Sequence, residues 1–207
     1  AVGYQALKNV VNSGASLGNY NTAQGYQALF SNTTGYEKSA QGDYTLLSNT
    51  TGYDNSAQGA YALRYNTTGY QNSAQGYAAL FYNTTGYYNS AQGVQALYYN
   101  TTGYYNSAQG YQALYYNTTG IGNSGVGYYT GLGLNNTNPD ERSVIDNYST
   151  FVGYNAGRDG AVASTTVLTG ASALGYNARV GANYSMALGG LGSYAVRVGI
   201  ASSTPAA

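Results

Sequence analysis

The chain contains no histidine and no cysteine among its 207 residues. Without a histidine, a cysteine or a nearby lysine base, its many serines have no partner to activate them as nucleophiles. The seven acidic residues are scattered along the chain. The sequence therefore predicts no enzyme, no catalytic residue and no cofactor. The missing cysteines also mean that disulfides give no indication of the redox compartment.

Charge is scarce as well. Seven basic residues balance seven acidic residues, so the formal net charge is zero. Binding to nucleic acid requires a basic surface that displaces counterions, and anionic membrane surfaces also attract basic clusters. The chain has neither an apolar run of about 18 residues nor the apolar region of a signal peptide. We therefore expect no nucleic-acid partner and no membrane insertion in this segment, with any export signal or anchor lying outside it.

What the chain does contain is a repeat rich in glycine and tyrosine, which number 30 and 27. The pattern Gly-Tyr-x-Asn-Ser-Ala-Gln-Gly-x-x-Ala-Leu-x-x-Asn-Thr-Thr occurs six times from Gly18 to Thr119 with a period of 17 residues and no insertion or deletion. A short fixed period with turn residues at fixed offsets is typical of a solenoid, in which each coil is stable only when stacked on its neighbours.

Each coil is predicted to contain two short strands and two turns. The Tyr-x-Asn-Ser-Ala-Gln stretch and the stretch typified by residues 111–116 would be the strands, and Asn-Thr-Thr-Gly would form a turn. Glycine recurs every seven to ten residues, which is too often for a helix of three turns. The expected fold is an all-β parallel solenoid, or β-roll, with neighbouring coils about 4.8 Å apart.

Two columns of the repeat never vary in the regular coils and are predicted to form the core. Burial of one leucine contributes about 1.5–3 kcal/mol relative to exposure, so a column of leucines is a substantial core for a thin object. The predicted core columns are Ala23, Ala40, Ala57, Ala74, Ala91 and Ala108, and Leu29, Leu46, Leu63, Leu80, Leu97 and Leu114.

Tyrosines also recur in register, so their rings should stack in offset columns about 4.8 Å apart. One column is expected at Tyr36, Tyr53, Tyr70, Tyr87 and Tyr104. Residues predicted to contact a surface or partner are Tyr65, Tyr82, Tyr98, Tyr99, Tyr115 and Tyr116. Two interpretations remain open: these rings grip sugars or apolar surfaces through many weak contacts, or they pack between protomers.

The organisation of the chain follows from where the period holds. Residues 1–17 are expected to form an entry coil with an insertion, 18–133 the 17-residue solenoid, 134–149 a polar insertion loop, 150–200 a second β-roll section, and 201–207 an extended exit segment.

Two polar features suggest sites, each with a simpler explanation. Asp140, Glu141 and Asp146 offer oxygen ligands, but their spacing lacks the pattern of a calcium loop, which favours a solvated loop and no metal. Six glycosylation sequons could carry sugars, although a turn with an amide ladder requires the same residues. The sequon asparagines are Asn32, Asn49, Asn66, Asn83, Asn100 and Asn117.

The second section carries a resemblance. Ala173-Leu174-Gly175 and Ala187-Leu188-Gly189 are 14 residues apart, and this pattern resembles the left-handed parallel β-roll heads of trimeric autotransporter adhesins, known as YadA-like heads. The ending from Val198 to Ala207 resembles the segment that precedes an endosialidase-type chaperone domain in bacterial and phage fibre proteins. The resemblance implies a homotrimeric extracellular stalk or head that binds matrix or a host surface.

Together these features predict a non-enzymatic structural and adhesive fibre module at a cell or virion surface. Its expected partners are copies of itself, as a homotrimer or an end-to-end polymer, and glycans or a host or matrix surface. The alternatives are a carbohydrate-binding module of a phage tail fibre, a functional amyloid and an ice-binding solenoid. The ice-binding alternative is weakened because Thr50 and Thr51 are adjacent and would face opposite sides of a strand.

Overall fold

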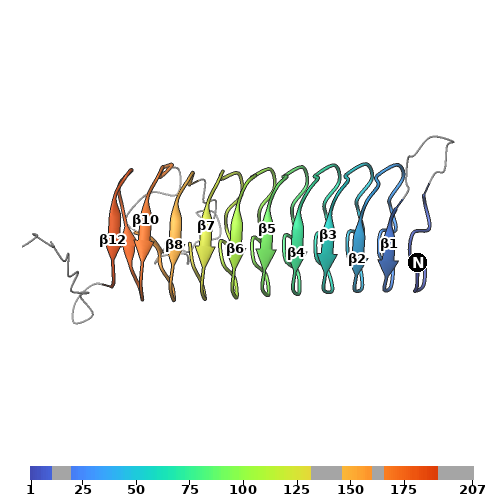
Figure 1. Cartoon of the computed structure of the whole chain (residues 1–207), viewed down its shortest axis with the longest axis horizontal. Helices are drawn as coiled ribbons and strands as arrows, with labels where there is room; N and C mark the ends of the chain where they lie inside the picture. Colours follow the sequence, from blue (N-terminus) through green and yellow to red (C-terminus); the bar gives the residue numbers. More distant parts are fainter. Residues whose placement is uncertain (11–19, 132–145, 160–165, 191–207) are drawn as a thin grey trace, which may run out of the picture.

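The computed structural model of the chain describes residues 1–10, 20–131, 146–159 and 166–190. Within these ranges the chain forms a parallel β-solenoid, a rod of stacked coils without a helix (Figure 1). The fold class predicted from the repeat is confirmed. Residues 11–17 of the expected entry coil, most of the expected loop at 134–149, the end of the second section and the exit segment at 201–207 lie outside the described residues.

One parallel sheet runs along the rod and contains ten three-residue strands in chain order. Equivalent residues pair directly, so that Ala57 lies opposite Ala74. A second sheet pairs β9 (Gly157–Arg158) with β11 (Arg179–Val180). The ten strands are β1 (Thr22–Gln24), β2 (Ser39–Gln41), β3 (Ser56–Gln58), β4 (Ser73–Gln75), β5 (Ser90–Gln92), β6 (Ser107–Gln109), β7 (Ser124–Val126), β8 (Thr150–Val152), β10 (Ser172–Leu174) and β12 (Met186–Leu188).

The regular coils contain one strand each, so the prediction of two strands per coil was wrong. The second half of the coil turns, because alternate residues adopt left-handed backbone angles, with φ of 53° at Ala78 and 52° at Leu80. Such angles are unfavourable by about 1–3 kcal/mol for residues other than glycine. Hydrogen bonds between coils impose them: Ala78 N donates to Ala60 O at 2.9 Å, and Leu80 N to Ala96 O at 3.0 Å.

The predicted core columns are buried throughout the regular coils. A further alanine column lies beside the leucines, and the three columns together form one continuous hydrophobic cluster. This additional column contains Ala28, Ala62, Ala79, Ala96 and Ala113. The core is narrow because each coil supplies only these few apolar side chains, so its length comes from repetition.

Two columns of buried asparagines flank the apolar core. In the sequon column, Asn83 Nδ2 donates to Asn66 Oδ1 at 2.8 Å and to Gly86 O at 3.0 Å. In the second column, Asn89 Nδ2 donates to Asn72 Oδ1 at 3.1 Å and to Gly103 O at 2.8 Å. The two columns meet at the same backbone carbonyls, because Gly86 O also accepts from Asn72 Nδ2 at 2.8 Å and Gly103 O also accepts from Asn100 Nδ2 at 3.0 Å. These buried carbonyls are therefore satisfied by donors from both ladders.

The glycosylation hypothesis does not fit this packing. All six sequon asparagines are at most 1% exposed, and their amide nitrogens already donate hydrogen bonds. A glycan would have to replace an amide hydrogen inside the rod. The amide ladder, which the same residues also allowed, is the arrangement found at Asn32, Asn49, Asn66, Asn83, Asn100 and Asn117.

The stack continues across the expected boundary, but the spacing between equivalent residues is no longer constant. Ile121 pairs with Asn147, 26 residues later, and Thr169 N donates to Asn183 Oδ1, 14 residues later. The coil has already resumed at Asp146, where residues 134–149 were expected to form a loop. Asp146 is buried and forms an ion pair with Arg158 at 3.1 Å, so its expected place in a solvated loop was wrong. Asp140 and Glu141 lie outside the described residues.

Candidate functional site: the tyrosine columns

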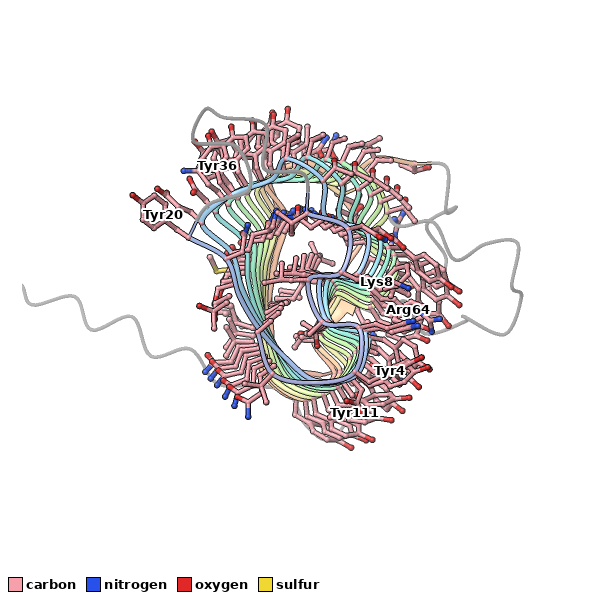
Figure 2. All side chains as sticks on the ribbon, turned by 90° about the vertical axis from the view of Figure 1, so that its right-hand side faces the viewer. Tyr4, Lys8, Tyr20, Tyr36, Arg64 and Tyr111 are labelled. Atoms are coloured by element: carbon pink, nitrogen blue, oxygen red, sulfur yellow. The ribbon has the colours of Figure 1, made fainter. Side chains whose placement is uncertain are left out.

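The solenoid converts each repeated tyrosine into a row of rings along the rod. Viewed along the rod axis, side chains project in rows around the coil, with Tyr36 near the top, Tyr111 at the bottom and Arg64 at the right (Figure 2). The outward side of the strands instead carries serine and glutamine, and Gln75 Nε2 donates to Gln58 Oε1 at 3.2 Å. The aromatic rows therefore leave the strand face polar.

The first column begins at Tyr36 and consists of rings that stack nearly parallel. Ring centroids are 5.2 Å apart between Tyr36 and Tyr53 and 4.7 Å apart between Tyr87 and Tyr104. Burial is the main cause that raises the pKa of Tyr87, and neighbouring tyrosines add to it. The stacking predicted from the repeat is thus present, at a spacing close to the distance between coils.

The six residues predicted to contact a partner form a double column. Tyr82 and Tyr99 stack at 5.3 Å, as do Tyr98 and Tyr115 at 5.0 Å, whereas Tyr82 meets Tyr98 edge-on at 89°. Burial, followed by the neighbouring tyrosines, raises the pKa of Tyr98 to about 12. Tyr65 and Tyr82 are the most exposed of the six at 37%. The structure therefore brings all six predicted contact residues together, namely Tyr65, Tyr82, Tyr98, Tyr99, Tyr115 and Tyr116.

A basic residue that the sequence did not single out lies within this aromatic surface. The guanidinium carbon of Arg64 is 5.2 Å from the ring centroids of both Tyr44 and Tyr61, 5.3 Å from Tyr65 and 5.8 Å from Phe81. Attraction between a cation and an aromatic ring contributes about 0.5–1 kcal/mol at exposed sites. Comparison of aligned repeats could have drawn attention to Arg64, because its column otherwise holds only apolar and aromatic side chains.

Lys38 is the second residue that the sequence analysis missed. It occupies an asparagine position in the second ladder and is only 2% exposed. Its Nζ donates to Gly52 O at 2.7 Å, as the equivalent asparagines donate to glycine carbonyls in other coils, and also to Asn32 Oδ1 of the sequon column at 2.6 Å. Burial lowers the pKa of Lys38 from 10.5 to about 7. The signal in the sequence was a charged residue where Asn55, Asn72 and their equivalents stand.

Lys38→Asn is expected to stabilise the protein at pH 7 and to remove a dependence of stability on pH. Between pH 7 and pH 10.5 the unfolded chain binds more protons at Lys38 than the folded chain, so the free energy of unfolding rises with pH in this window. The full change is up to about 5 kcal/mol, since one pKa unit corresponds to about 1.4 kcal/mol. Urea unfolding of both proteins at several pH values measures it.

Lys8→Asn is the matched control, because Lys8 is exposed. It should leave the slope of stability against pH unchanged. Parallel pH profiles for the original protein and Lys38→Asn would contradict the account of the buried amine.

Among the residues that the structure describes, no three metal-ligating side chains are grouped closely enough to hold a metal ion. Glu37 and Asp54 do lie together, and a hydrogen bond to Asp54 is the main cause that raises the pKa of Glu37. In the same part of the chain, no helix is long and apolar enough to cross a bilayer.

Comparison of the chain with protein-family models, with curated proteins and with solved structures finds no match. Function is therefore inferred from the tyrosine columns and the rod that carries them.

Proposed function

We propose that this chain is a non-enzymatic extracellular fibre module that provides rigid reach and many weak surface contacts. The observation that carries the proposal is the set of partly exposed rings held in register along the rod. Tyr65 and Tyr82 are 37% exposed, Tyr88 is 42% exposed and Tyr105 is 56% exposed. Tyr65 and Tyr82 lie on the side of Arg64, and Tyr88 and Tyr105 belong to the column of Tyr20 on the other side (Figure 2). Exposed aromatic rows of this kind usually mark interfaces.

Repetition supplies the mechanism. One ring binds a sugar face or an apolar surface weakly, but rings on the same rigid rod engage together, so that the second contact forms at a high effective concentration. Parallel stacking of Tyr65 on Tyr82, at 5.4 Å and 5°, fixes the orientation of both rings before contact. Less conformational freedom is then lost on binding than for free side chains.

The same surface suits copies of the chain. Aromatic residues are enriched at the centres of protein interfaces, where they exclude water. We propose self-association as a homotrimer or as an end-to-end polymer, with the fibre displayed on a cell or virion surface. Glycans or a host or matrix surface would be the other partners.

Replacing Tyr65, Tyr82, Tyr88 and Tyr105 together with serine is expected to weaken adhesion at least about tenfold, since multivalent contacts are lost together. Adsorption to an apolar surface and to a polysaccharide film, measured by quartz-crystal microbalance, gives the readout. Sedimentation velocity on the same samples reports self-association.

The control replaces exposed glutamines of the strand face, Gln58 and Gln75, with serine. It should adsorb and sediment like the original protein. Undiminished adsorption of the tyrosine variant, with its melting curve retained, would refute the proposed adhesive role of these rings.

A further inference from the structure

One outward-facing column changes from tyrosine to smaller or polar side chains in the middle of the rod, where Ala78, Gln95 and Gln112 follow two tyrosines. Tyr44 and Tyr61 occupy equivalent positions in successive coils, and their rings stack at 5.3 Å and 7°. The next coil places Ala78 at this position with φ of 53°, close to the 56° of Tyr44 and the 63° of Tyr61. The backbone therefore continues the column unchanged, while the ring that would stack next on Tyr61 is absent.

The missing ring leaves a cavity of about 130 Å³. Ala78 is only 2% exposed although its column faces outward, because larger side chains surround it. A protein cavity of about 150 Å³ can bind benzene. This one is nearly as large and is open on one side, so a six-membered ring can enter it with one edge left in solvent. The residues that line the cavity are Tyr61, Arg64, Tyr77, Ala78, Phe81, Gln95 and Tyr98.

The walls around this cavity are aromatic on several sides. Tyr77 meets Tyr61 edge-on at 79°, and Phe81 stacks on Tyr98 at 4.9 Å. Rings held in this way present faces and edges to a planar guest, which matches the mixture of stacked and edge-on contacts that aromatic groups prefer. A flat ring entering beside Ala78 would extend the stack of Tyr44 and Tyr61 by one ring.

Two polar groups at the cavity have unused hydrogen-bonding capacity. Arg64 lines the cavity, and no carboxylate of the described residues forms an ion pair with it. Its Nε is enclosed by neighbouring side chains without a hydrogen-bond partner, so the two outer nitrogens of the guanidinium are the donors that a ligand would meet. Gln95 Oε1 accepts a hydrogen bond from Gln112 Nε2 at 2.6 Å, which leaves the Gln95 amide nitrogen as a donor. A guanidinium and an amide nitrogen beside one cavity are suited to a carboxylate.

We propose that the cavity beside Ala78 binds one six-membered ring that carries a carboxylate. The ring stacks on Tyr61 in the place of the missing side chain, and the carboxylate accepts hydrogen bonds from Arg64 and Gln95. A sugar acid and an aromatic acid share this chemistry. The site goes beyond the proposed adhesive function, because it selects one kind of ligand and does not require many rings to act together.

Saturation-transfer NMR and calorimetry with four probes test the proposal: benzoate, benzyl alcohol, D-glucuronate and D-glucose. At least one acid is expected to bind at least about tenfold more tightly than its neutral counterpart, since hydrogen bonds between charged groups are stronger than neutral ones. The acid that binds better identifies the source of the ring. Equal binding of acid and neutral partner in both pairs, or binding of none of the probes, would overturn the proposal.

Two variants test separately how the volume of the cavity and the charge of Arg64 contribute to binding. Ala78→Tyr introduces the residue that three other coils carry at a similar backbone angle, namely Tyr44, Tyr61 and Tyr129, so it should fill the cavity, keep the fold and abolish binding. Arg64→Leu introduces the residue found at the equivalent Leu47. It should lower the affinity for the acid to that for its neutral counterpart. The second variant keeps the test decisive if the first fails to fold.

Gln71→Tyr is the matched control. Gln71 belongs to the column of Tyr20, which Figure 2 places on the other side of the rod from Arg64, and later coils carry Tyr88 and Tyr105 at this position. It should bind the acid as the original protein does. Retained binding in a folded Ala78→Tyr protein would overturn the site even if the fibre proved adhesive.

Discussion

Gly76→Ala is expected to lower the free energy of unfolding by more than about 3 kcal/mol, because strained backbone alone contributes about 1–3 kcal/mol. Gly76 has a φ of 134°, which L side chains rarely adopt. An added Cβ would also lie 2.5 Å from Gly93 O and 2.7 Å from Gly93 C, atoms of the next coil. Neither can move away without separating the two coils. Urea unfolding followed by circular dichroism measures the change.

Ser73→Ala, in the same coil, is the control for this variant. Ser73 lies on the exposed side of β4, and surface substitutions of this kind usually change stability by no more than about 0.5 kcal/mol. If Gly76→Ala and Ser73→Ala had the same free energy of unfolding, the coils would tolerate a side chain at this contact, which would contradict the geometry described.

Asn83→Asp is expected to lower the free energy of unfolding by about 3–5 kcal/mol at neutral pH, the range seen when a buried charge loses its partner. The two side chains have nearly the same shape. The aspartate, however, directs an acceptor at Asn66 Oδ1 and Gly86 O, which now accept hydrogen bonds from Asn83 Nδ2. The two hydrogen bonds that Asn83 Nδ2 donates are thereby lost, and the aspartate oxygen repels the two oxygens that accepted them.

The free energy of unfolding of Asn83→Asp should also depend on pH. Burial raises the folded-state pKa of such a carboxyl group above its unfolded value. The folded variant then binds more protons, so its stability falls as pH rises from the ordinary pKa through the raised pKa. Stability should recover in acid relative to the original protein. Gln75→Glu, in the exposed glutamine column, is the control and should lose little stability at neutral pH. Equal stability of the two variants at pH 7 would argue against the buried ladder.

Much of the architecture could be predicted from the repeat. A constant period of 17 residues places Ala57 over Ala74 once the strands pair in parallel, and the invariant leucines then form a core column. The same logic predicted the stacked tyrosines. Residues that occur once in a column, such as Arg64 and Lys38, were harder to interpret, because their environment comes from side chains elsewhere in their own coil and in neighbouring coils.

The superposition of equivalent residues follows from the repeat alone, since the period has no insertion over six repeats. Apart from the leucines, the folded stack was needed to establish which columns face inward in the second half of each coil. Leu80 and Ala78 adopt left-handed angles there, so the alternation of a β-strand no longer tells inside from outside. Hydrogen bonds to the coils above and below hold these angles. Those bonds exist only in the stack, which is why the burial of Asn83 and the cavity beside Ala78 could not be derived from one repeat alone.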